Sequence, residues 1–210
     1  MRLSSVLLAA LLGPSLLPAQ SRPPGWRVRT DAPAPDSAVS HVRMPPGWHI
    51  TTGPVASIVY DPANQASGRF AIEAEIFLFP GTNNEGYGVF LGGRSLDGSS
   101  GSWTAFLLTR DGSASIERRE GGVTTALFPP VKSPAVKPHD GGEGTAHNIM
   151  RVLVQGDSAI LSANGQRITA IHARDLPLDG TFGFRVGTGT NLHISNLDLV
   201  TRLAPFPVRR

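Results

Sequence analysis

The chain has 210 residues, no cysteine, 19 basic and 16 acidic residues, and a net charge of +3 at pH 7. Its apolar fraction of 40% can form a hydrophobic core, which excludes global disorder, and the lack of cysteine excludes a disulfide framework. A charge this close to zero gives no general attraction to nucleic acid, while 24 glycines and 18 prolines favour many turns and short strands.

The segment 1–19, MRLSSVLLAALLGPSLLPA, has the layout of a secretory signal peptide. Arg2 precedes an apolar run, Gly13-Pro14 interrupts that run, and small residues stand near Ala19. The run is too short and too broken to span a membrane. We therefore expect cleavage near Ala19 and a secreted or periplasmic protein, whose net charge falls from +3 to +2 when Arg2 is lost. The alternative is an apolar N-terminal element of the fold.

The phrase PPGW occurs twice, at residues 23–26 and 45–48, and each copy leads into an alternating run. The copies are short and the runs after them differ, which favours two Trp-anchored edge strands on either side of a Pro-rich loop, 33–40, over a structural repeat. We expect an N-terminal strand and Pro-rich arm over 20–44, a sandwich over 45–200 and a flexible tail over 201–210.

From residue 49 onward, apolar residues alternate with polar ones in short runs separated by Gly, Pro, Asn or Asp. Asp111-Gly112 and Asn164-Gly165 are tight hairpin signals, because these residues accept a positive φ. The pattern predicts an all-β fold, a two-sheet antiparallel sandwich in which each strand has one buried and one solvated face. The expected strands are 49–52, 56–60, 69–79, 87–93, 103–109, 113–120, 123–128, 148–155, 158–163, 166–172, 181–187 and 191–200.

Two segments depart from simple alternation. Leu192 and Ile194 share one phase and Leu197 and Leu199 the other, so a β-bulge near residues 195–196 is expected to return both pairs to the core. Residues 132–145, KSPAVKPHDGGEGT, have no period and predict a long mobile loop.

Five stretches, GWHITTGP, SGRFAIEAEIFLF, EGYGVFLGG, HNIMRVLVQGDSAILSANGQRI and GTFGFRVGTGTNLHISNLDLV, carry a resemblance over residues 47–200. In their order and turns they resemble the concanavalin A-like lectin/glucanase (laminin-G-like) jelly roll. Within it they are most similar to the 3-keto-disaccharide hydrolase family, which is related to glycoside hydrolase family 16. The resemblance implies a jelly-roll sandwich that contacts carbohydrate or hydrolyses a glycosidic bond. The chain departs from the family at His147-Asn148, where the family has Trp, and it lacks the glucanase catalytic strand.

Glu73 and Glu75 are the candidate catalytic carboxylates. They stand two apart on one predicted strand, so they project from one face with Cα atoms about 6–7 Å apart. Glycoside hydrolysis uses carboxyl pairs at separations near this value. The alternative is that both are ordinary solvent-facing carboxylates.

The candidate ligand-binding residues are aromatic or basic. Aromatic faces stack on sugar rings and guanidinium groups donate to hydroxyls. Arg151, Arg185 and His193 are expected to share one solvated face late in the chain. The alternatives are that this face is ordinary sheet surface and that Trp103 caps the edge of the core. The candidates are Tyr87, Arg94, Trp103, Arg110, Arg151 and Arg185; the Asp97 carboxylate could also bond to hydroxyls.

No cofactor is predicted. The six histidines have no metal-binding spacing, and the Asp- and Asn-containing loops could hold calcium, although no loop has a series of ligands. The sequence favours an exported glycan-binding or interaction module without catalysis; the alternatives are a glycosidic-bond hydrolase and a structural envelope domain with no ligand.

Overall fold

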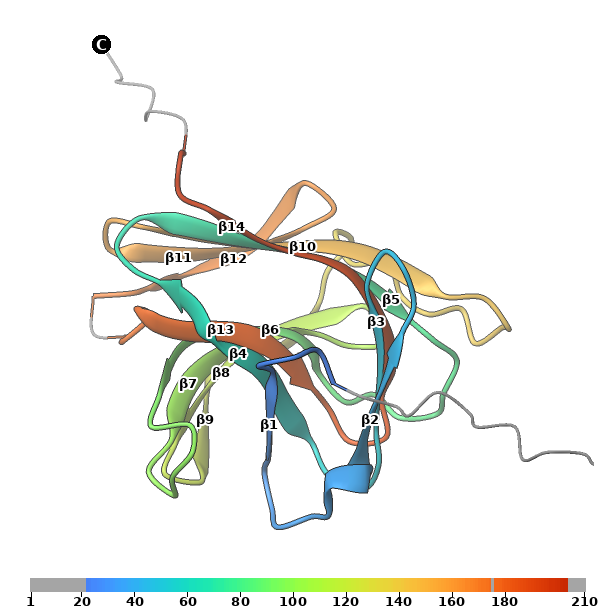
Figure 1. Cartoon of the computed structure of the whole chain (residues 1–210). Helices are drawn as coiled ribbons and strands as arrows, with labels where there is room; N and C mark the ends of the chain where they lie inside the picture. The colour runs from blue at the N-terminus through green and yellow to red at the C-terminus, as the bar shows by residue number, and fades with distance from the viewer. Residues whose placement is uncertain (1–21, 175, 204–210) are drawn as a thin grey trace, which may run out of the picture.

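A computed structural model describes residues 22–174 and 176–203 of the protein. The predicted leader and most of the predicted tail lie outside these residues. Two antiparallel sheets of seven strands pack face to face, as predicted for a two-sheet sandwich (Figure 1). In the part of the chain that is described, no helix has the length and apolarity needed to cross a membrane.

The two edge strands of sheet A are β1, which is short and near the N-terminus, and β9, which is long and comes from the middle of the sequence. Consecutive strands β6, β7, β8 and β9 are hairpin neighbours, whereas β13 inserts between β4 and β6 from late in the chain. In spatial order its strands are β1 (Arg27–Thr30), β4 (Ser57–Ala66), β13 (Gly180–Val186), β6 (Tyr87–Arg94), β7 (Ser102–Leu108), β8 (Ser113–Glu120) and β9 (Val123–Lys132).

Sheet B places β5 at its centre, between β10 and the last strand, β14. One 3-10 turn, Asp36–Ala38, precedes its edge strand β2. In spatial order its strands are β12 (Gln166–His172), β11 (Ser158–Ala163), β10 (Ala146–Gln155), β5 (Phe70–Leu78), β14 (Asn191–Val200), β3 (Trp48–Thr52) and β2 (Val39–Arg43).

The main core lies between the sheets and follows the predicted alternation. On β5, Phe70, Ile72 and Ile76 are fully buried, and the glutamates between them face outward. The bulge predicted near residues 195–196 is confirmed, because the pairing of β14 with β5 shifts register between Ile194 and Asn196. The shift keeps Ile194 buried and lets Leu197 pack against the core. The expectation that Leu199 also returns to the core is wrong, because Leu199 is 38% exposed.

The sequence missed three pieces of strand, the first of which is the second half of β4, residues 61–66. Residues 39–43 form β2, which pairs with β3, so β3 lies one strand in from the edge that it was predicted to form. Strand β9 continues past its predicted end at residue 128 through Pro129 and Pro130. Proline is tolerated there because β9 is an edge strand and its pairing with β8 is irregular at that point. The segment 20–44 therefore contributes one strand to each sheet, β1 to sheet A and β2 to sheet B.

Sheet A is strongly curled, with its concave face turned away from sheet B. Four strands separate β1 from β8, a distance of about 24 Å in a flat sheet. Nevertheless, Arg119 on β8 lies 3.0 Å from Asp31, the residue after β1. Figure 1 shows β1 descending on one side and β7, β8 and β9 on the other, with β13, β4 and β6 between them.

Curling has buried the face that the alternation predicted to be solvated. A second hydrophobic cluster, centred on Phe90, Trp103 and Leu107, lies on the concave side of sheet A. On β13, Arg185 is only 8% exposed. The prediction of one wet face per strand is therefore wrong for β6, β7 and β13, since both faces of these strands are covered.

The hairpin between β11 and β12 turns at Asn164 and Gly165, both of which have positive φ, as predicted. The Asn164 side chain also accepts from the Ile149 amide and donates to Ala135 O and Asn148 Oδ1, at 3.0, 2.9 and 2.8 Å. It thereby ties the turn to the predicted loop 132–145, in which Ala135 and Val136 are buried.

Replacing Asn164 by alanine is expected to lower the free energy of unfolding by about 2 kcal/mol. The change removes three hydrogen bonds and strains a residue at positive φ. Urea unfolding of Asn164→Ala, with Asn164→Gly as the control that relieves the strain alone, measures both contributions. Equal stability of the alanine variant and the wild type would contradict the prediction.

Candidate functional site

The concave face of sheet A carries a cleft of about 660 Å³. Its walls come from β1 and the segment that follows it, 31–36, from Arg119 on β8, and from the loop between β6 and β7. The residues with polar groups toward it include Arg29, Asp31, Tyr60, Asp97 and Arg119. We call this space the concave cleft.

Trp103 packs against two arginines that line the concave cleft, Arg29 and Arg119. It is 2% exposed and packs edge-on against Phe90, with ring centroids 6.4 Å apart. The guanidinium carbons of Arg29 and Arg119 stand 5.4 and 5.6 Å from its ring centroid. Both distances allow cation–π attraction. Trp103 therefore helps to position two arginines that line the cleft.

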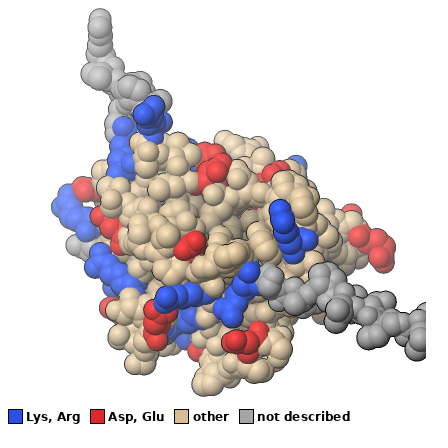
Figure 2. Space-filling model, viewed as in Figure 1, with Lys and Arg blue, Asp and Glu red and all other residues tan. Residues whose placement is uncertain are grey.

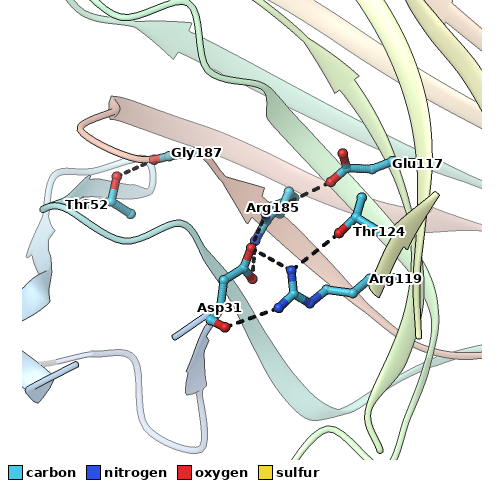
Figure 3. A network of polar contacts seen from close by, with 7 residues as sticks. All are labelled: Asp31, Thr52, Glu117, Arg119, Thr124, Arg185 and Gly187. Carbon is cyan, nitrogen blue, oxygen red and sulfur yellow. Dashed lines mark hydrogen bonds and ion pairs between the residues drawn. The ribbon is translucent and has the colours of Figure 1, made fainter. Parts of the chain in front are cut away.

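Asp31 links three elements of the curled sheet (Figure 3). Both Arg185 terminal nitrogens donate to its carboxylate at 2.7 Å, and Arg119 donates to the carboxylate at 3.0 Å and to the Asp31 carbonyl at 3.1 Å. Bidentate guanidinium–carboxylate pairs are strong and directional. The network therefore fixes the side chains of β8 and β13 relative to the end of β1.

Glu117 adds a second carboxyl group to the network, 3.8 Å from Arg185 Nε (Figure 3). Burial raises the pKa of Glu117, and the opposing attraction of Arg185 is the smaller effect. Two carboxyl groups in different environments thus share one arginine at the concave face.

The rim of the cleft is held by the loop after β6. Asp97 accepts from Arg27 at 2.6 Å and from the Tyr60 hydroxyl at 3.2 Å, and Arg29 donates to the carbonyls of Leu96, at 2.7 Å, and Gly98. Burial, and secondly the charge of Asp97, raises the pKa of Tyr60 to about 12. Tyr60 therefore remains a hydroxyl donor at any physiological pH.

The structure separates the predicted ligand-binding residues. Trp103 and Arg185 lie at the concave face, whereas Tyr87 is 1% exposed in the core between the sheets. Arg110 donates to two backbone carbonyls, at 2.8 and 3.0 Å, and so braces a loop. Arg94 is exposed at the end of β6.

Glu73, Glu75 and Arg151 lie on the outer face of sheet B, on the opposite side of the molecule from the cleft. Glu73 pairs with Arg151 at 2.7 Å and Glu75 contacts His147 at 2.8 Å. The prediction that Arg151, Arg185 and His193 share a face is wrong: Arg185 belongs to sheet A, whereas the other two belong to sheet B.

Figure 2 shows basic and acidic side chains interspersed over the face in view. Within residues 22–174 and 176–203, no three His, Cys, Asp or Glu side chains are grouped closely enough to hold a metal ion.

No known protein family and no curated protein sequence matches the chain. Solved structures do match it in shape. The carbohydrate-binding module CBM66 from Bacillus subtilis superposes with a TM-score of 0.63 at 13% identity, covering 84% of this chain and 96% of that one. The chain has the concanavalin A-like jelly-roll fold.

Two further structures with the concanavalin A-like fold are similar. The family 16 glycoside hydrolase of a Bacteroides ovatus mixed-linkage glucan locus, solved with a product, gives a TM-score of 0.57 at 10% identity, covering 83% and 94% of the two chains. The VIP36 lumenal domain, bound to Ca²⁺ and mannose, gives 0.56 at 12% identity, covering 88% and 86%. At these identities the likeness establishes the concanavalin A-like fold alone.

Proposed function

We propose that this protein is an exported glycan-binding module and that the glycan lies in the concave cleft of sheet A. The observation that carries the proposal is the cleft itself: preorganised guanidinium, carboxylate and phenol groups line one space of about 660 Å³. Export rests on the leader-like segment 1–19. Carbohydrate-binding and lectin domains among the structural neighbours support the ligand class.

The chemistry of the cleft suits a ligand rich in hydroxyl groups. A sugar hydroxyl both donates and accepts, so it needs donors and acceptors side by side. Arg29 and Arg119 supply donors, while Asp31 and Asp97 supply acceptors. Because Trp103, Asp31 and the loop after β6 already hold these groups in place, binding would require little ordering of side chains.

Replacing Arg119 by glutamine is expected to weaken glycan binding at least tenfold, because it removes donors that face the cleft. Isothermal titration calorimetry with the oligosaccharides selected on a glycan array measures the change.

Asp97→Asn, at an exposed rim position, should weaken binding several-fold with little effect on the melting temperature. Arg167→Gln, on β12 of sheet B, is the matched control and should bind like the wild type.

Unchanged affinity in both cleft variants would refute the site, and failure of the wild type to bind any arrayed glycan would favour the structural domain without a ligand. Hydrolysis is the second candidate, favoured by Asp31 and Glu117 sharing Arg185 while burial raises the pKa of Glu117. Release of shorter products during the same titrations would favour hydrolysis over simple binding.

A further inference from the structure

A second cavity, of about 290 Å³, opens between the two sheets at the end of the sandwich where β1 and β2 lie. We call it the inter-sheet crevice. Its lining is mostly apolar and aromatic, and it belongs to a different part of the molecule from the concave cleft. The lining residues on which the argument depends are Trp26, His41, Trp48, Ile50, Phe184 and Leu197.

The two PPGW segments meet at this crevice. Pro23 and Trp26 of the first line one side, and Gly47 and Trp48 of the second line the other. The Trp26 ring stacks on Phe184, with centroids 6.0 Å apart and an interplanar angle of 16°. Glycine is required at position 47, because a Cβ there would clash with the Ile194 carbonyl at the bulge of β14.

His41 is the buried polar side chain of the crevice. It is 3% exposed, and its Nε2 atom has no hydrogen-bond partner among the described residues. Burial, and secondly the charge of Arg22, lowers the pKa of His41 to about 4, so the ring is neutral at physiological pH. A buried polar atom left without a partner is unfavourable, and a ligand that supplies one relieves that cost.

We infer that the inter-sheet crevice binds a small uncharged molecule with a flat apolar ring and one hydroxyl group, the ring lying between the tryptophans and the hydroxyl bonding to His41. The volume is close to the lower limit of small-molecule sites, which are mostly apolar with few polar groups. The tryptophan and phenylalanine faces offer stacking partners to a ring. A neutral imidazole offers no counter-charge to an anionic ligand, and Arg22, the cation that acts on His41, is already paired with Asp36 at 3.6 Å.

The test compares three probes of similar size, phenol, toluene and benzoate, by calorimetry and tryptophan fluorescence on the full chain. Phenol is expected to bind roughly three- to tenfold more tightly than toluene, the margin of one hydrogen bond, and benzoate more weakly than either. In His41→Phe, which keeps an aromatic ring but loses Nε2, phenol and toluene should bind alike. His172→Phe, at an exposed position on β12, is the matched control and should keep the preference for phenol.

Absence of binding by phenol and toluene at millimolar concentration would overturn the inference, as would an undiminished preference for phenol in His41→Phe. The nitrogen NMR resonance of His41 Nε2 gives a readout that needs no variant: phenol should shift it and toluene should not, and a resonance unmoved by phenol counts against the inference. Glycan binding should be unchanged in His41→Phe, so the two proposed sites can fail independently.

Discussion

Replacing Asp31 by alanine is expected to lower the free energy of unfolding by about 3–5 kcal/mol. Its carboxylate is the partner of two arginines whose side chains are only 10% and 13% exposed. Removing one member of a buried ion pair leaves charge without compensation, which costs far more than the pair contributes. Glu117, at 3.8 Å from Arg185 only, cannot compensate both arginines. Chemical denaturation of the variant and the wild type measures the loss.

Two further variants separate charge from packing. Asp31→Asn keeps an oxygen acceptor and is expected to lose less stability than Asp31→Ala. The double variant Asp31→Ala with Arg185→Met removes one of the buried charges together with its partner and should recover part of the loss. Equal stabilities of Asp31→Ala and the wild type would show that the network does not hold the curled sheet together.

Acidification is expected to destabilise the protein through His41 by about 3 kcal/mol between pH 6.5 and pH 4. The folded protein lowers the pKa of His41 from 6.5 to about 4, mainly through burial and secondly through the charge of Arg22, while a backbone hydrogen bond with Val39 opposes the shift. Between these two values the unfolded chain binds the proton and the folded chain does not. Stability is therefore fully present above pH 6.5 and falls as the pH falls.

Unfolding free energies at pH 7, 6, 5 and 4 for the wild type and His41→Gln test this expectation, because the difference between the two slopes isolates His41. Removal of the neighbouring charge in Arg22→Gln should flatten the dependence partly. His172→Gln, at an exposed histidine, should keep the wild-type slope. Parallel curves for the wild type and His41→Gln would contradict the lowered pKa.

The alternation of apolar residues predicted the sandwich because it is a local property. Two-residue periodicity decides which side of a strand is buried, and so Phe70, Ile72 and Ile76 fell where expected. The bulge in β14 was predictable for the same reason, since Leu192 and Leu197 could not both reach the core without it.

The concave cleft was not predictable from local pattern, because it depends on the curl of sheet A. Asp31 and Arg119 are 88 residues apart in sequence, and only curvature brings them together. The same curvature buried Arg185, which alternation had placed in solvent. Position along a strand also misplaced Tyr87: its nearness to a loop suggested exposure, whereas its phase on β6 sends it into the core.

A faint signal for the cleft was nevertheless present. In RVRTD, Arg27 and Arg29 share one face of β1, opposite Val28, and an acidic residue stands just beyond the strand. The structure gives these two arginines partners on neighbouring elements, Asp97 and the carbonyls of the loop after β6.

The diproline in β9 decides how this molecule can meet another extended chain. Proline has no amide hydrogen, so residues 129 and 130 cannot donate to a strand laid along the free side of β9. The hydrogen-bond ladder of a foreign strand would be interrupted there, even though Val131, next to the prolines, and Val123, at the start of β9, are exposed. The diproline thus disfavours edge-to-edge aggregation along β9, the outermost strand of sheet A, which also carries the concave cleft.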